Sequence, residues 1–225
     1  MSTLPLPELP SENVHDIPQQ TTAIHLTALD AYSGQPGAIP GVTFWPRVAA
    51  RVIDIVVHNI IAICGGALFG LMLGIAAGLQ HNRQALRAFE RPDGGLTLII
   101  FGLMGMIILE TICEGFHGST PGKLLLGFVV VQEDGTPCRF GSAFIRSIGF
   151  FIDGLFFGLI GYFAMQKTPQ EQRHGDEWAH TIVGRRANVT RSNLRSMGQF
   201  TMVFLLAAMA DAALLMTGML LKTVL

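Results

Sequence analysis

The sequence has few charged residues, few cysteines, and no lysine or arginine in its first 43 positions. Charged residues make up 14% of the 225, against about 25% in an average soluble domain, while 50% are hydrophobic and the mean hydropathy is +0.46. This scarcity of charge excludes an ordinary soluble domain and indicates a membrane protein. The lipid bilayer is therefore an expected partner of the chain. The formal net charge of −1 gives no basic surface for nucleic acid, so no nucleic-acid partner is expected.

The three cysteines, Cys64, Cys113 and Cys138, have neither the number of a disulfide framework nor the spacing of a zinc site. The first residues carry acids and prolines, where a signal peptide would have a basic start and an apolar core. We therefore expect insertion through the first membrane helix. Residues 1–43 hold most of the prolines and show no hydrophobic period, which predicts a disordered tail.

Long apolar runs predict membrane-spanning helices. Ile55 to Leu79 is a run of 25 residues, which would span about 37 Å as a helix. Leu96 to Cys113 gives 18 residues whose only charge is Glu110, close to the end. Phe200 to Leu221 gives 22 residues with Asp211 at the centre. Each run is long enough to cross a bilayer.

A further apolar run, Ala143 to Met165, is interrupted by Arg146 and Asp153 and contains four glycines. It either crosses the membrane once or breaks near Gly154 into two half-helices. A break would move the basic segment 166–199 to the opposite side, so the orientation stays open. The predicted fold is an all-α membrane protein, a bundle of three to four transmembrane helices.

A compact polar stretch lies between the apolar runs Leu96 to Cys113 and Ala143 to Met165. Thr120 and Pro121 are typical of a helix N-cap and first turn, which predicts a short helix PGKLLLG that Gly127 ends. Asp134-Gly135 lies between extended runs in VVVQEDGTPCRF, which favours a β-hairpin. A short polar helix and β-hairpin element is therefore expected here.

Ionisable residues lie on one face of the first predicted helix. At 100° per residue, Arg47, Arg51, Asp54 and His58 share an arc of about 60°, so this face must contact protein or water. The later run repeats the spacing, because Arg146 and Asp153 are seven residues apart, as Arg47 and Asp54 are.

The repeated spacing suggests cross-helix ion pairs. Residues seven apart lie about 10.5 Å apart along a helix and do not readily meet. We expect Arg47 or Arg51 to pair with Asp153, and Arg146 with Asp54. Such a cluster is either a structural clamp or part of a transport path.

Other polar residues allow weaker interpretations. Glu110 and Glu114, four apart, form either a cation site or two acids that face water. His58 is either a proton relay or a packing residue. His174 and His180 lie off a common helix face, so a metal site with Asp176 is disfavoured.

No cofactor or catalytic chemistry is expected. The TPGK segment lacks the GxxxxGK[ST] spacing of a phosphate-binding loop, although a helix start beside Lys123 suits an anion or lipid headgroup. No serine or cysteine nucleophile stands in a pattern with histidine, so no enzyme activity, catalytic residue or metal is predicted.

Three segments resemble the RDD family of bacterial membrane proteins, named for an arginine and two aspartates. The segment FWPRVAARVID is similar to the first helix of the family. The stretch from Glu114 through TPGK to the helix with Arg146 and Asp153 resembles the most recognisable part of the family's sequence. HGDEWAHTIVGRR, with Asp176, resembles the closing segment. The resemblance covers about residues 44–186.

The resemblance implies a multi-pass protein of the bacterial cytoplasmic (inner) membrane, in which Glu114, Lys123 and Asp176 are further candidate functional residues. Residues 187–199 would be a polar linker and 200–225 an additional C-terminal helix. Transport of ions or small solutes has been suggested for members. A transporter and a non-transporting scaffold or assembly factor both fit the sequence, with a homo-oligomer or a membrane partner left open.

Overall fold

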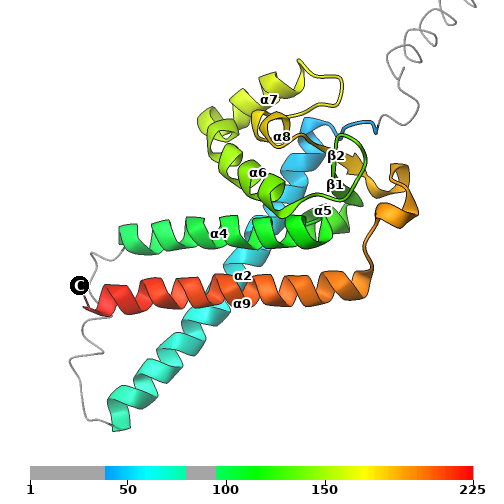
Figure 1. Ribbon diagram of the computed structural model, residues 1–225. Helices are drawn as coiled ribbons and strands as arrows, with labels where there is room; N and C mark the ends of the chain where they lie inside the picture. Colours follow the sequence, from blue (N-terminus) through cyan, green and yellow to red (C-terminus); the bar gives the residue numbers. More distant parts are fainter. Residues whose placement is uncertain (1–38, 80–94, 225) are drawn as a thin grey trace, which may run out of the picture. The chain divides into compact units, whose positions relative to one another are not determined.

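The computed structural model describes residues 39–79 and 95–224, so most of the expected disordered tail lies outside the described residues (Figure 1). Its three long helices are α2 (Phe44–Leu79), α4 (Gly95–His117) and α9 (Met197–Val224). All three are long and apolar enough to cross a membrane by length and composition. The prediction of a helical bundle of three to four transmembrane helices is confirmed, with three candidate membrane spans in the described residues.

The three long helices pack through small residues. Figure 1 shows α4 and α9 side by side, with α2 crossing them. A Cβ added at Gly218 of α9 would lie 2.6 Å from the ring of Phe101 on α4, so only glycine allows this approach. At Gly65 of α2 an added Cβ would lie 3.5 Å from that of Ala212 on α9. Small residues of this kind let helix backbones approach closely in lipid.

The remaining apolar run breaks near Gly154, as one of the two predicted alternatives required. It forms α6 (Phe140–Asp153), the 3₁₀ helix η2 (Leu155–Gly158) and α7 (Leu159–Met165). The 14 residues of α6 extend about 21 Å, which is too short for a hydrocarbon core of about 30 Å. Its apolar residues are largely exposed, whereas Arg146 and Asp153 are buried. It is therefore an amphipathic helix.

The predicted short helix is present as α5 (Pro121–Leu125). The Thr120 hydroxyl accepts a hydrogen bond from the Lys123 backbone N–H at 3.4 Å, as an N-cap residue does. Gly127 follows with φ +74°, a left-handed conformation that favours glycine. The N-cap and the end of this helix were thus both readable from the sequence.

The predicted hairpin is wrong in its strand pairing. The turn at Asp134-Gly135 forms, since the Gly135 N–H donates to the Gln132 carbonyl at 2.9 Å. However, β1 (Phe128–Gln132) pairs antiparallel with the distant β2 (Thr181–Arg185). The residues after the turn contribute a single bridge at Pro137. Proline lacks a backbone N–H, and the buried β1 instead pairs with the apolar β2.

The small sheet also holds the beginning of the first membrane helix. Gly41 bridges to Gly184 of β2, and the Val42 N–H donates to the Val183 carbonyl at 2.8 Å. Helix α8 (His174–Trp178) precedes β2, and η3 (Arg186–Asn188) and η4 (Arg191–Asn193) lead on to α9. The start of α2 and the whole segment from α5 to η4 therefore lie at the same end of the bundle.

Gly149 of α6 provides a test of this packing. A Cβ there would lie 2.5 Å from the Gly175 Cα of α8, whereas Gly141 of α6 has nothing within 4 Å. We expect Gly149→Ala to lower the free energy of unfolding by about 1–3 kcal/mol through overpacking. Gly141→Ala should leave it unchanged or raise it by up to about 1 kcal/mol. Thermal denaturation of the detergent-solubilised variants would measure both, and equal melting temperatures would contradict the packing.

Candidate functional site

Ten ionisable side chains meet where α2, α4, α5, α6 and α8 converge, and together they form what we call the charge cluster. They are five basic and five acidic residues: Arg47, Arg51, Lys123, Arg146 and Arg173 with Asp54, Glu110, Glu114, Asp153 and Asp176. Eight are buried, and Arg51 and Arg173 are partly buried. Equal numbers of opposite charges allow such a group to persist away from water.

Asp176 of α8 is the centre of this cluster. Its carboxylate lies 2.5 Å from Nη1 of Arg47, 2.6 Å from Nη1 of Arg146 and 3.8 Å from Nη2 of Arg173. Burial by itself would raise the pKa of Asp176, but the three guanidinium groups outweigh it and hold the pKa well below its usual range. Asp176 therefore stays ionised and ties α8 to both α2 and α6.

Arg146 extends the network from α6 to α4 and β2. Its Nε donates to Glu114 at 3.0 Å and its Nη1 to the Thr181 hydroxyl at 2.9 Å. Burial would lower the pKa of Arg146, but the carboxylates of Asp176 and Glu114 outweigh it and raise the pKa above its ordinary value. The guanidinium is thus a permanent charge with two carboxylate partners.

The two glutamates of α4 bind cations of the protein itself. Lys123 of α5 contacts both, at 3.3 Å from Glu110 and at closer range from Glu114. Arg51 of α2 donates to Glu110 at 2.7 Å. Of the two alternatives that the sequence left open, the one with two acids that face water is wrong, because both glutamates are buried. Their oxygens are occupied by ammonium and guanidinium groups.

The TPGK motif connects α5 to Asp54 of α2. The Thr120 hydroxyl donates to Asp54 at 2.6 Å, and the Gly122 N–H donates to it at 2.7 Å. A Cβ at Gly122 would lie 2.1 Å from the Ala50 carbonyl oxygen, so only glycine allows α5 to approach α2. A helix start favours an anion, and the anion held here is the protein's own aspartate.

The cross-helix pairs expected from the sequence are wrong. Arg47 pairs with Asp176 rather than Asp153, and Arg146 pairs with Asp176 and Glu114 rather than Asp54. Asp153 accepts the Gly175 N–H at 3.2 Å and lies 3.0 Å from Nδ1 of His174. Both aspartates are held by the first residues of short helices, which leaves the arginines to the carboxylates of α4 and α8.

Most of the predicted site residues do come together, and two further members were missed. Six of them contact another member of the cluster directly, namely Arg47, Arg51, Glu114, Lys123, Arg146 and Asp176. Asp54 is joined to the cluster through Thr120 and Gly122 at the start of α5, and Asp153 lies at its edge. Sequence reasoning did not select Glu110 or Arg173 as cluster members. Glu110 is detectable, since it lies one turn before Glu114 on the same helix face.

A separate ionisable pair lies where the three long helices cross. Nδ1 of His58 on α2 lies 2.8 Å from Oδ2 of Asp211 on α9. A Cβ at Gly105 of α4 would lie 2.0 Å from Asp211 Oδ1, so glycine makes room for the carboxylate. Asp211 is fully buried, and within residues 39–79 and 95–224 its Oδ1 has no hydrogen-bond partner. His58 is one turn beyond Asp54 on α2.

A metal site finds no support in the part of the chain that the structure describes, where no group of three or more His, Cys, Asp and Glu residues is placed to hold an ion. His174 contacts Asp153, and the exposed His180 lies 3.6 Å from Glu133. The three residues considered for a metal therefore point to different partners.

Comparison with known proteins identifies one family. The model of the RDD family matches residues 42–180, a range that includes all ten members of the charge cluster. Asp211 and the rest of α9 lie outside the matched range. No curated protein and no solved structure matches the chain.

Removal of the central carboxylate should destabilise the protein. We expect Asp176→Asn to cost about 3–5 kcal/mol, because Arg47 and Arg146 would be left buried beside a neutral group. Glu177→Gln, a neighbour without an ion pair in the described structure, is the matched control. The measurement is the melting temperature of the purified protein.

The effect of Asp176→Asn should depend on pH in a defined direction. The pKa of Asp176 lies below its ordinary value of 3.8, so its contribution is fully present above about pH 4 and is lost as the pH falls further. The melting temperatures of wild type and Asp176→Asn should therefore converge in acid. A constant difference between pH 3 and pH 7 would contradict the assignment.

Proposed function

The chain belongs to the RDD family of membrane proteins, and on that premise we propose that it moves a small ion or solute across the bilayer along the buried face of α2. The observation that supports the proposal best is the His58–Asp211 pair at the crossing of α2, α4 and α9. Charges that only held the polar elements together would not need to continue into the apolar bundle. This pair does continue there.

Ionisable groups succeed one another along α2. A cavity of about 20 Å³ lies against Arg51, Asp54, Glu110 and Lys123, which is room for about one water molecule. His58 follows Asp54 after one helical turn, about 6 Å along the axis. The buried residues of α2 include Arg47, Asp54 and His58. Space for a water molecule at the charge cluster is thus followed along α2 by the His58–Asp211 pair in the bundle.

The chemistry of the pair suits a proton or a small cation. An imidazole nitrogen can bind a proton and pass it on, and a neighbouring carboxylate can receive it. Oδ1 of Asp211, which lacks a partner in the described part of the chain, can accept a proton or contact a cation. Ionisable residues inside membrane helices often belong to such pathways.

The distribution of basic residues supports one orientation. Eleven of the 15 Lys and Arg residues lie at the end of the bundle that holds the start of α2 and residues 118–196. The other four lie elsewhere, and they are Arg83, Arg87, Arg91 and Lys222. Because positively charged segments stay on the cytoplasmic side, we place the charge cluster at the cytoplasmic face of a cell membrane.

A scaffold role is the second candidate, and the pairing within the charge cluster favours it. Ion pairs join α2 to α8, α2 to α4, α5 to α4, and α6 to both α4 and α8. Charges with partners of this kind hold elements together and need not move anything. A folded wild-type protein that carries no flux would favour this role.

Flux across vesicles should depend on the His58–Asp211 pair. We expect purified wild-type protein in liposomes with an internal pH-sensitive dye to respond to an imposed Na⁺, K⁺ or solute gradient. His58→Gln and Asp211→Asn should each reduce that response to the level of protein-free vesicles, because the proton or cation then has no site within the bundle.

Asn59→Ala is the matched control for this experiment. Asn59 follows His58 and is exposed, and within the described residues its side chain hydrogen-bonds only to the Ile55 carbonyl of its own helix, at 2.8 Å. Its replacement should leave flux unchanged. Variants are compared at equal amounts of folded protein, judged by melting temperature. Full flux in both pair variants would rule out the proposed path.

The orientation can be tested by labelling. In a chain whose three cysteines are replaced by alanine, Gln84→Cys should react in intact cells with a membrane-impermeant maleimide. Trp178→Cys, at an exposed position of α8, should react only after the membrane is opened. The reverse pattern would place the charge cluster on the outer face.

A further inference from the structure

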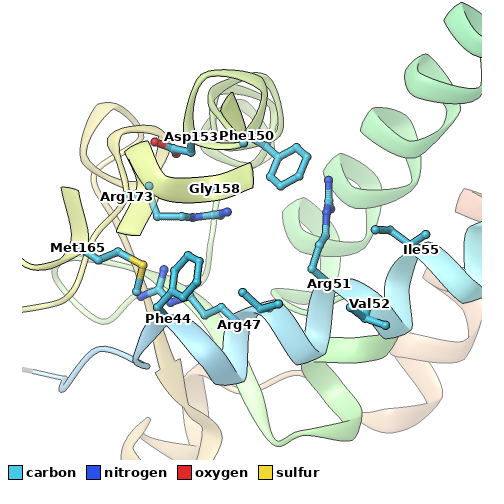
Figure 2. Close-up of a pocket in the computed structure, with 13 residues that line it drawn as sticks. Phe44, Arg47, Arg51, Val52, Ile55, Phe150, Asp153, Gly158, Met165 and Arg173 are labelled. Carbon is cyan, nitrogen blue, oxygen red and sulfur yellow. The ribbon is translucent and has the colours of Figure 1, made fainter. Parts of the chain in front are cut away.

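A cavity of about 250 Å³ lies between the first half of α2 and the segment from α6 to α7 (Figure 2). One part of its wall is apolar and includes Val52 and Ile55 of α2 and Phe150 of α6. The other part is strongly basic, since Arg47, Arg51 and Arg173 line it. In Figure 2, Arg51, Phe150 and Arg173 project into the space between α2 and the segment from α6 to α7. The cavity thus has basic side chains on one part of its wall and apolar side chains on the other.

The carboxylate in this wall does not neutralise the arginines. Asp153 is the acidic residue among the lining residues, and its oxygens already face the Gly175 N–H and the His174 ring. Asp176 and Glu110, which pair with the arginines, are not part of the lining. The lining therefore holds three guanidinium groups and one carboxylate, while Asp176 and Glu110 pair with Arg47 and Arg51 from behind the wall.

Two of the arginines have donors to spare. The Arg173 side chain makes no hydrogen bond within the described residues, and its nearest carboxylate oxygen, on Asp176, is 3.8 Å away. Arg51 donates to Glu110 and lies 3.8 Å over the Phe150 ring, while its buried Nε has no partner there. Buried guanidinium donors without acceptors suit an anion with several oxygens, such as phosphate.

The surroundings of the cavity are those of a membrane surface. Val52 and Ile55 are 55% and 41% exposed, and they begin the apolar surface of α2 that continues into the bilayer. The exposed face of α6 is also apolar, with Phe144, Ile148 and Ile152. An amphipathic helix of this kind lies at the boundary between headgroups and acyl chains. With α6 at that boundary, the opening of the cavity would lie at the depth of the lipid phosphates.

We propose that this cavity binds the phosphate group of an acidic phospholipid from the surrounding bilayer. The phosphate oxygens accept hydrogen bonds from Arg51 and Arg173, and the upper part of one acyl chain lies against Val52 and Ile55. The rest of the lipid remains in the membrane, since about 250 Å³ holds only part of it. A lipid with a neutral, zwitterionic headgroup brings its own cation and satisfies Arg51 and Arg173 less well.

The test is lipid binding by the purified full-length chain. Native mass spectrometry in nonionic detergent would count bound phosphatidylglycerol and phosphatidylcholine with identical acyl chains. We expect wild type to prefer phosphatidylglycerol by at least about tenfold. Arg173→Gln should remove about tenfold of that affinity, as expected for the loss of one charged hydrogen bond. Arg139→Gln, an exposed arginine outside the cavity, should change nothing.

A second variant separates a lipid from a free anion. Val52→Trp fills the apolar wall and leaves every charge in place, so it should weaken phosphatidylglycerol binding while inorganic phosphate at millimolar concentration fails to displace the lipid. Equal binding of both lipids to wild type, or unchanged binding in Arg173→Gln, would overturn the proposal. Displacement by inorganic phosphate with full binding in Val52→Trp would also overturn it, in favour of a free-anion site. Because neither His58 nor Asp211 lines the cavity, the result is independent of the flux experiment.

Discussion

The buried contact between Asp176 and two arginines from different helices is the interaction on which the rest of the structure depends. It joins α8 to α2 through Arg47 and to α6 through Arg146, and Arg146 continues to Glu114 on α4. A single unpaired charge in such a place would cost several kcal/mol, so the members of the cluster require one another. The amphipathic helix α6 is consequently fixed against the membrane helices, although it does not itself cross the bilayer.

The sequence was most informative where a pattern is local. Apolar length predicted α2, α4 and α9, and Thr120-Pro121 predicted the start of α5, because these features depend on neighbouring residues. The helical period of α2 also placed Arg47, Asp54 and His58 correctly on a buried face. The helical period of a sequence shows which face of the helix is buried, but it does not show which residues pack against that face.

The errors therefore concern partners that are distant in the sequence. Asp54 is held by the N–H of Gly122, and backbone donors carry no sequence signal of their own. The strand β1 pairs with β2 across about fifty residues, although a turn follows β1 directly. Asp211 had no assigned role before α2 and α9 were seen to cross at His58. Each of these contacts is decided by tertiary packing.

The order of the contacts along the chain has a consequence for biogenesis. Arg47 precedes Asp176 by 129 residues, and Val42 likewise meets β2 only after nearly all of the polar segment has been made. During synthesis the first helix thus enters the membrane before Asp176, the carboxylate partner of its arginine, has left the ribosome. Until α8 emerges, water and lipid headgroups at the bilayer surface must solvate this guanidinium. The polar end of the bundle can close only after β2, which ends at residue 185 of 225, has been made.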